Sequence, residues 1–234
     1  MSNNYFQFKK FTIVQDKCAM KVCTDACLFG GLIPANLNKV LDIGTGTGLL
    51  PLMLAQKNPH AIIDTVEIDA DAAQQAKENI EASPWAHRLH VYNNDVLAFD
   101  PGKQYDCIIS NPPFFENDLK SPDAAKNNAK HNTTLGLKQL LIKAESLLTS
   151  DGLFAVLLPY KQVENFIEEA AKLGLHLNQH MLVKQTLKHK FFRGILFFTR
   201  NETSLLQTEL LIKDSEGNYT EEFTSILKDY YLFL

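Results

Sequence analysis

The stretch Val40-Leu41-Asp42-Ile43-Gly44-Thr45-Gly46-Thr47-Gly48-Leu49-Leu50 decides the fold. It begins as an apolar run around one acid, which is typical of a buried strand, and a second apolar run follows the glycines. Glycine lets a backbone turn tightly and leaves no side chain between that backbone and a ligand. The stretch therefore predicts a buried strand over 39–43, a tight turn beside a ligand, and a helix over 48–57.

The spacing of the glycines separates two kinds of nucleotide site. A dinucleotide-binding fingerprint has glycine or alanine three residues after its second glycine, and Leu49 stands there in this chain. An NAD-linked oxidoreductase is therefore disfavoured. The Gly-x-Gly-x-Gly spacing after Asp42 resembles motif I of S-adenosyl-L-methionine (SAM) methyltransferases. The alternative is a plain strand-to-helix turn without a ligand.

Strand and helix patterns alternate along most of the chain. A strand over 6–14 and a helix over 24–33, capped by Thr24 or Asp25, come first. Further strands are predicted over 62–67, 89–92, 105–110, 153–158, 176–184, 192–200 and 205–213, and helices over 71–82, 137–148, 162–173 and 220–229. This alternation predicts a doubly wound α/β sheet covered on both faces, with an antiparallel C-terminal edge. We expect one domain over 1–234, in which 1–36 form an N-terminal extension.

Composition restricts the class of protein. The chain has 234 residues, of which 45% are hydrophobic and 21% charged, as in an ordinary globular domain. No apolar run is long enough to predict a membrane-spanning helix. The start of the chain lacks a signal-peptide pattern and the four cysteines form no Cys-x-x-Cys pair, so we expect a reducing cytoplasm. His176 and His180 are four residues apart on a predicted strand, so no metal is expected.

Two acids follow the next two predicted strands. Glu67 closes the strand over 62–67, where a carboxylate can accept hydrogen bonds from both hydroxyls of a ribose. Ile68 can lie against an adenine ring, while Asp69 is better placed to cap the following helix. Asp95, before Val96, can accept from the adenine amino group, or it can form an Asx-turn at the strand end. Together with the glycine turn, these residues predict a nucleoside site.

The segment Ile108-Ile109-Ser110-Asn111-Pro112-Pro113-Phe114-Phe115 carries the predicted chemistry. Its two prolines end the strand in a rigid turn at the carboxyl edge of the sheet. The Asn111 side-chain oxygen and the Pro112 carbonyl can hold the two hydrogens of an exocyclic amine, which directs its lone pair at a methyl donor. Phe114 can stack on a flat ring. The alternative is a structural Pro-Pro turn after a buried strand.

Charge is unevenly distributed, although the chain as a whole carries a net charge of −4. The part between 103 and 200 is net positive, and its densest piece, 184–193, interleaves aromatic residues with four cations: Lys184, Lys188, Lys190 and Arg193. Such a pattern is typical of a surface that meets phosphates and bases, and equally of a solvated loop between two strands. The long loop over 116–132 is a second candidate for substrate binding.

A family resemblance extends over nearly the whole chain. Asn-Pro-Pro-Phe at 111–114 is similar to the Asn/Asp-Pro-Pro-Tyr/Phe motif of amino-methyltransferases that act on adenine, guanine or a glutamine amide. The chain resembles the bacterial tRNA1(Val) (adenine(37)-N(6))-methyltransferases in the segments 18–25 (Cys-Ala-Met-Lys-Val-Cys-Thr-Asp), 41–56, 83–86, 109–115, 133–135 and 231–234. It departs from them at Phe114 and Phe115, where relatives carry tyrosines, and at Cys23, where glycine is frequent.

The resemblance implies strand order 3-2-1-4-5-7-6, SAM as cofactor and the anticodon loop of a tRNA as acceptor, with Phe115 at the RNA. It implies that SAM contacts fall on Asp42, Gly44, Gly46, Glu67 and Asp95. Gly48, Ile68, Val96 and Asn111 are further expected cofactor contacts. The segment over 21–25 would cover the methionine end of SAM, with Lys21 at its carboxylate and Thr24 or Asp25 at its amine; from the residues alone, salt-bridge and capping roles fit as well.

The acceptor and the reaction have rivals. A ribosomal RNA base or a protein glutamine amide could receive the methyl group through the same chemistry. A non-catalytic module that binds SAM or RNA is the alternative of another class. For the assembled protein, a monomer is favoured.

Overall fold

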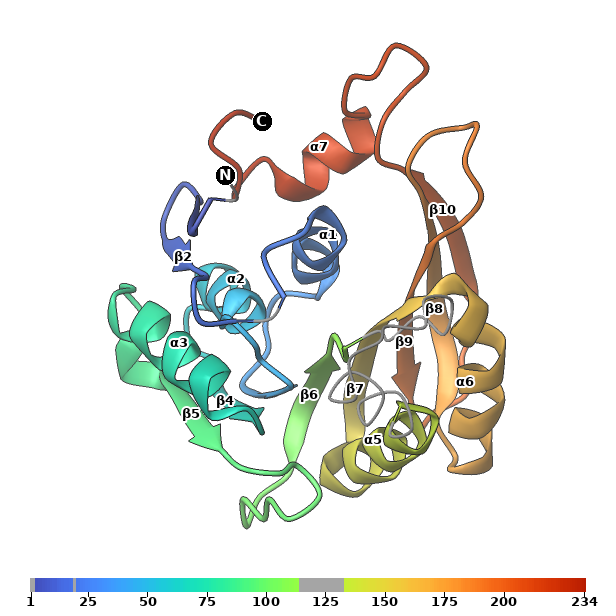
Figure 1. The fold of residues 1–234 in the computed structure, drawn as a ribbon. Helices are drawn as coiled ribbons and strands as arrows, with labels where there is room; N and C mark the ends of the chain where they lie inside the picture. Colours follow the sequence, from blue (N-terminus) through green and yellow to red (C-terminus); the bar gives the residue numbers. More distant parts are fainter. Residues whose placement is uncertain (1–2, 19, 114–132) are drawn as a thin grey trace, which may run out of the picture.

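The computed structural model describes residues 3–18, 20–113 and 133–234. Two short strands and a helix precede a regular alternation of strand and helix, as Figure 1 shows. The elements in chain order are β1 (Tyr5–Gln7), β2 (Thr12–Val14), α1 (Thr24–Leu32), β3 (Lys39–Ile43), α2 (Leu49–Lys57), β4 (Ile62–Glu67), α3 (Ala70–Glu81), the 3-10 helix η1 (Ala86–Arg88), β5 (Leu89–Asn93), β6 (Tyr105–Ser110), α5 (Thr133–Leu147), β7 (Leu148–Pro159), α6 (Tyr160–Lys172), β8 (His176–Lys184), β9 (Arg193–Thr199), β10 (Leu206–Leu211) and α7 (Glu221–Leu227).

The central sheet has eight strands in the order β10-β8-β9-β7-β6-β3-β4-β5. Numbered from β3, its strands β3 to β9 run 3-2-1-4-5-7-6, and β10 extends the sheet beyond β8. The antiparallel C-terminal part is β9, which pairs antiparallel with both β7 and β8. The outermost strand β10 instead runs parallel to β8, because the chain passes over β8 before it re-enters the sheet. The α/β fold class is therefore confirmed.

The strand expected over 6–14 is divided in the structure, and that prediction was wrong. β1 and β2 form an antiparallel pair, and the chain reverses between them with a hydrogen bond from the Phe8 amide to the Phe11 carbonyl of 2.8 Å. Both phenylalanines are buried and their rings stack at 4.5 Å. Their common burial favours a turn at the two intervening lysines over a continuous strand.

The helix starts differ in their capping. α1 begins at Thr24, its N-cap residue is Cys23, and no side chain caps it, so the expected cap from Thr24 or Asp25 was wrong. Both residues lie inside the first turn, where an acid also interacts favourably with the helix dipole. Asp69 does cap α3, because its carboxylate accepts a 2.8 Å hydrogen bond from the Ala72 amide.

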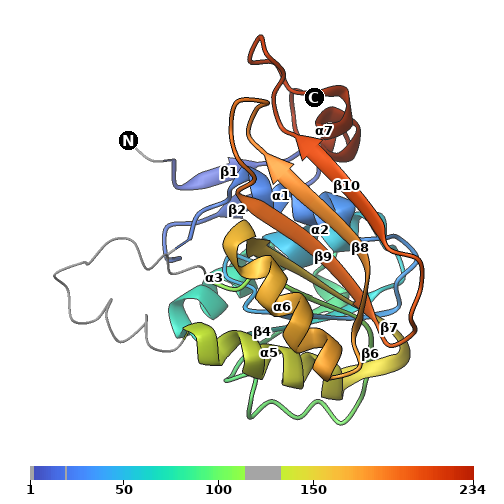
Figure 2. The ribbon, with the colours of Figure 1, turned by 90° about the vertical axis from the view of Figure 1, so that its right-hand side faces the viewer.

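Two hydrophobic clusters fill the space on the two faces of the sheet. Along β7, Ala155 and Leu157 belong to the cluster with α1 and α2, while Val156 and Leu158 belong to the cluster with α5 and α6. This alternation follows from the two-residue period of a strand, and it explains why the central strands are apolar throughout. Figure 2 shows α5 and α6 along one face of the sheet and α1 and α2 behind it. In the part of the chain that the structure describes, no helix has the length and apolar character to cross a membrane.

Asn79 on α3 joins the N-terminal hairpin to the glycine turn. Its side-chain nitrogen donates to the carbonyls of Val14 and Thr47, both at 2.8 Å, and its oxygen accepts from the Val14 amide at 2.9 Å. Thr47 lies inside the glycine turn. The amide of one buried side chain therefore satisfies backbone groups of two segments that are far apart in the sequence.

We expect Asn79→Ala to lower the free energy of unfolding by about 2–3 kcal/mol, since it leaves buried backbone groups without partners. Urea unfolding followed by circular dichroism measures the change. Gln74→Ala is the matched control, because Gln74 is exposed on the same helix and bonds only Glu78; its effect should stay within about 0.5 kcal/mol. Equal stability of Asn79→Ala and wild type would refute this role.

Candidate active site

The glycine turn between β3 and α2 opens onto free space. Gly44, Gly46 and Gly48 have φ angles of +76°, +55° and +80°, which other residues rarely adopt. A Cβ atom added at Gly44 or Gly46 would meet nothing within 4 Å. At these two positions backbone conformation requires glycine, and the space beside them is available to a ligand.

Glu67 holds the glycine turn in place from the end of β4. Its two carboxylate oxygens accept from the backbone amides of Gly46 at 2.9 Å and Asp69 at 3.0 Å. Glu67 is predicted to bind a ribose, and in the structure it also binds the glycine turn. A carboxylate oxygen has two lone pairs, so both oxygens retain acceptor capacity toward a ligand.

Asp42 is a buried carboxylate on the strand that leads into the glycine turn. It lies in β3, is fully buried, and neither oxygen has a hydrogen-bond partner among the described residues. Burial raises its pKa from 3.8 to about 7 and the charge of Glu67 adds to the rise, while the nearby Thr45 hydroxyl acts in the opposite direction. Unpartnered buried acceptors are costly, so a site that leaves them unpartnered is suited to a polar ligand.

Asn111 stands beside this turn at the end of β6. The hydroxyl of Ser110 donates to the Ile43 carbonyl at 2.9 Å, which joins the ends of β6 and β3 directly before Asn111 and Gly44. The Asn111 side-chain oxygen is buried and has no partner among the described residues. Asn111 and Pro112 are thus at the carboxyl edge, as expected; Phe114 and Phe115 lie outside the described residues.

Ile68 and Asp95 lie at the ends of the two neighbouring strands. Ile68 is 70% exposed, which leaves its side chain available for a flat ring. One Asp95 oxygen accepts from the Leu97 amide at 2.9 Å, so the Asx-turn alternative holds at least for that oxygen. Val96 is partly buried and packs against the hydrophobic cluster that contains residues of α5 and α6.

Sequence reasoning missed Asn93, whose amide donates to the carbonyls of Glu67 at 2.9 Å and Ile68 at 3.2 Å.

The segment over 21–25 is fixed at the start of α1. Lys21 is exposed and donates to the Asn3 carbonyl at 3.4 Å, and Thr24 interacts with the phenol of Tyr231. Asp25 is buried and forms a 2.7 Å ion pair with Arg193 at the start of β9. No local pattern predicts this pair, because 168 positions separate its members.

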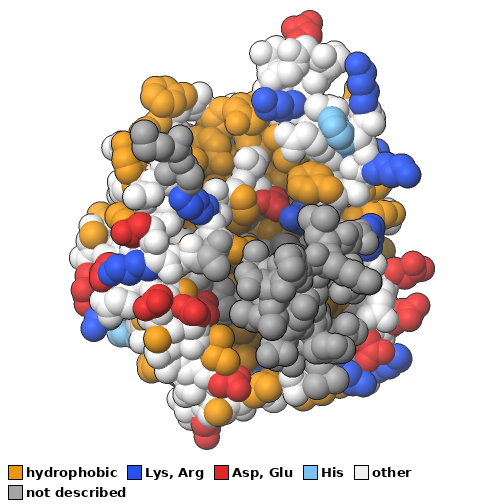
Figure 3. Space-filling view, in the orientation of Figure 1, with side chains coloured by type: hydrophobic (Ala, Val, Ile, Leu, Met, Phe, Trp, Pro, Cys, Tyr) orange, Lys and Arg blue, Asp and Glu red, His pale blue; other side chains and the backbone are white. Residues whose placement is uncertain are grey.

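The four expected RNA-binding cations differ in their surroundings. Arg193 pairs with Asp25, and Lys184 pairs with Glu209 at 3.2 Å. Lys188 and Lys190 are exposed on the hairpin between β8 and β9. Figure 3 shows basic side chains on this side of the molecule, and the loop over 116–132 lies outside the described residues.

Among the described residues, no group of three or more His, Cys, Asp or Glu could hold a metal ion.

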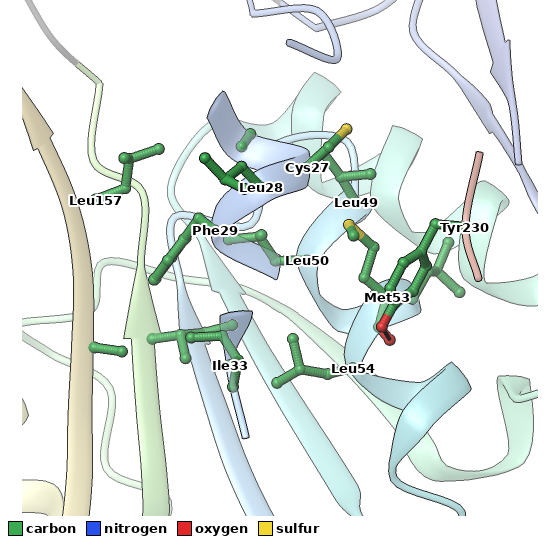
Figure 4. Close-up of a cluster of buried hydrophobic side chains, with 14 of the residues drawn as sticks. Cys27, Leu28, Phe29, Ile33, Leu49, Leu50, Met53, Leu54, Leu157 and Tyr230 are labelled. Carbon is green, nitrogen blue, oxygen red and sulfur yellow. Dashed lines mark hydrogen bonds between the residues drawn. The ribbon is translucent and has the colours of Figure 1, made fainter. Parts of the chain in front are cut away.

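α1 lies against α2 with little space between them. A Cβ atom added at Gly30 would stand 2.7 Å from the sulfur of Met53, so a larger residue there would displace the Met53 side chain. Figure 4 shows the apolar side chains at this contact, which include Cys27, Leu28 and Phe29 of α1 and Leu49, Leu50 and Met53 of α2. Since α2 begins at the glycine turn, this packing positions the start of α1 relative to the site.

Fold and site together define a methyltransferase. The chain matches the Methyltransferase small domain family over residues 24–193. A solved structure from Agrobacterium tumefaciens, described as a predicted O-methyltransferase, superimposes with a TM-score of 0.68 over 88% of this chain and 96% of its own, at 15% identity. At that identity the likeness shows the fold alone. The cofactor that this class implies is SAM, and the unpartnered oxygens of Asp42 and Asn111 beside the open turn fit a polar nucleoside ligand.

More similar relatives identify the particular family. A protein of Dyadobacter fermentans named tRNA1(Val) (adenine(37)-N6)-methyltransferase is 42% identical, and the match covers 98% of each chain. A protein of the same name from Pectobacterium carotovorum is also 42% identical, over 98% of this chain and 94% of the relative. The chain belongs to the tRNA1(Val) (adenine(37)-N6)-methyltransferase family.

We expect Asp42→Asn to stabilise the cofactor-free protein at alkaline pH. Because the folded state raises the pKa of Asp42 from 3.8 to about 7, wild-type stability falls as pH rises through that interval and is level above it. The variant lacks this loss, so it should exceed wild type by about 2–4 kcal/mol at pH 8 and match it near pH 4. Urea unfolding at both pH values measures the difference. A gain that is equal at the two values would contradict the assignment to Asp42.

Proposed function

We propose that this protein transfers a methyl group from SAM to the exocyclic amino nitrogen of adenosine 37 in the anticodon loop of a valine tRNA. One observation carries the proposal: the Asn111 oxygen, which has no partner among the described residues, stands beside the glycine turn. It does so in a chain that is about 40% identical, over nearly its full length, to enzymes of that name. The fold alone would not identify the acceptor, since one fold hosts many substrates.

The cofactor contacts in this proposal come from four strand ends. SAM, when bound, supplies an electrophilic methyl group on a sulfonium. Glu67 accepts hydrogen bonds from the ribose, Ile68 lies against the adenine, and Asp95 accepts from its amino group with the oxygen that does not bond Leu97. Contacts to the remainder of SAM are assigned to Asp42, Gly44, Gly46, Gly48, Val96, Lys21 and Thr24.

Asn111 and Pro112 orient the acceptor. An exocyclic amine is a poor nucleophile, because its lone pair is delocalised into the ring. The Asn111 oxygen and the Pro112 carbonyl accept the two amine hydrogens, which directs the lone pair at the methyl group and stabilises the charge that develops on nitrogen. Phe114 is assigned to stack on the target ring. The loop is single-stranded, so extrusion of the base is inexpensive.

The proposed RNA contacts are Lys184, Lys188, Lys190, Arg193 and Phe115. Lys188 and Lys190 are exposed and meet phosphates directly. Arg193 and Lys184 also bind Asp25 and Glu209, so their first task is to hold the hairpin. The proposed acceptor is a tRNA, and the proposed compartment is the cytoplasm.

We also propose that 1–234 form one domain, in which 1–36 pack over the cofactor site. The Asn79 bridge to Thr47, the α1–α2 contact and the Asp25–Arg193 pair support this arrangement. The turn after β1 also pairs with the C-terminal segment through a 2.8 Å hydrogen bond from the Lys9 amide to the Tyr230 carbonyl. We propose that this unit acts as a monomer without a metal ion.

Incubation with labelled SAM and unmodified total tRNA tests the function. We expect label in tRNA as N6-methyladenosine, and we expect Asn111→Ala to lower kcat by about 100-fold or more, since it removes an acceptor that acts on the transition state. Parallel fractions of ribosomal RNA and protein test the rival acceptors.

An unchanged melting temperature must accompany the lost activity of Asn111→Ala, and its SAM affinity is measured separately because Asn111 is also an expected SAM contact. Label only in ribosomal RNA or in protein would keep the chemistry and reject the acceptor. SAM binding without label in any fraction would favour the non-catalytic module.

Lys188→Ala and Lys190→Ala are expected to raise KM for tRNA and leave kcat unchanged. Each lysine that meets a phosphate should also reduce the slope of log affinity against log salt by about one unit. Filter binding over a salt series measures the slope. Lys172→Ala is the control, because Lys172 is an exposed lysine at the C-terminal end of α6, whereas the N-terminal end of α6 bonds the hairpin. The assignment of RNA binding to the hairpin fails if all three variants behave alike.

A further inference from the structure

Three side chains from different elements form a row at the carboxyl edge of the sheet. The ring of Tyr160, the first residue of α6, lies 5.4 Å from the ring of Phe191, with 39° between the ring planes. The ammonium of Lys184, the last residue of β8, lies over the Phe191 ring at 3.9 Å. We call Tyr160, Phe191 and Lys184 the aromatic row.

The aromatic row is attached to the rigid part of the sheet. The Tyr160 amide donates to the Phe192 carbonyl at 3.1 Å, and the Phe192 amide donates to the Val183 carbonyl at 3.1 Å. The ion pair with Glu209 on β10 holds Lys184 from the other side. A ring supported in this way loses little conformational entropy when a flat ligand stacks on it.

Tyr160 is open to solvent in spite of this support. Tyr160 is 44% exposed, whereas most large aromatic residues of the sheet are buried. Lys184 occupies the space over Phe191, so Tyr160 offers the larger free aromatic surface. An exposed tyrosine in this position contributes little to the core, and its ring has a cation and a second ring for neighbours.

The Tyr160 end of the aromatic row follows β7, the strand that neighbours β6 and its Asn111. β7 pairs with β6, with Val156 opposite Ser110, and the two strands leave the sheet at the same edge. Tyr160 directly follows β7, and Asn111 directly follows β6. The exposed Lys188 and Lys190 belong to the same hairpin as Phe191. Aromatic rings beside cations are the usual means of binding unpaired nucleotides.

We propose that Tyr160 and Phe191 form a stacking site for an unpaired nucleobase that neighbours the methylated adenosine. This inference rests on the proposed function and deepens it, because it adds a second base contact to that of the target. Lys184 holds the Phe191 ring through its cation, and the base stacks on the Tyr160 ring. The site selects acceptors whose target lies in an unpaired loop, because a paired neighbour would not be free to stack.

Tyr160→Ala tests the site with a synthetic anticodon stem-loop as acceptor. Loss of one stacked base should raise KM for the stem-loop about tenfold and leave kcat and SAM affinity unchanged. Tyr160→Trp should restore the wild-type KM, since it keeps an aromatic surface. Abasic nucleotides are then placed in turn on either side of the target. One of them should raise KM for wild type but not for Tyr160→Ala.

Tyr219→Ala is the matched control. Tyr219 is 41% exposed, stacks on Phe223 and lies under the Lys213 ammonium, but it follows the edge strand β10. Its KM for the stem-loop should equal that of wild type. An unchanged KM in Tyr160→Ala, or equal abasic effects in both proteins, would overturn the stacking site. Absence of any methylation by wild type would instead overturn the proposed function.

Discussion

The hydrogen bonds from the Gly46 and Asp69 amides to the Glu67 carboxylate are the constraint on which the site depends. They join the ends of β3 and β4 and hold the glycine turn open in a conformation that few other residues could adopt. The hydrogen bond from the Ser110 hydroxyl to the Ile43 carbonyl connects β6 to the same edge, so Asn111 stands beside the turn. A cofactor and an acceptor can therefore meet at one edge of a rigid sheet.

This arrangement has a cost in stability. Among the described residues, the buried oxygens of Asp42 and Asn111 have no hydrogen-bond partner, and burial raises the pKa of Asp42 to about 7. These oxygens would be better satisfied in water, so their burial costs free energy, and the polar groups of a nucleoside could supply the missing partners. The large apolar clusters on the two faces of the sheet offset this cost, and the site stays preorganised instead of collapsing.

The N-terminal segment and the hairpin after β8 share one frame. The Asp25–Arg193 pair joins the start of α1 to the start of β9, and Asn79 joins the hairpin of β1 and β2 to the glycine turn. Segments that the proposal assigns to SAM and to RNA are thus held by the same buried contacts.

The sequence by itself determined the alternation of strands and helices, the glycine turn and the acids at strand ends, because periodicity, glycine and proline act locally. β3, β4, β6 and β8 have the bounds expected of them. Only the tertiary structure decided the turn at Phe8 and Phe11, the parallel pairing of β10, the Asp25–Arg193 pair and the aromatic row at Tyr160. Each of these depends on which distant residues become neighbours, and a local pattern does not record that.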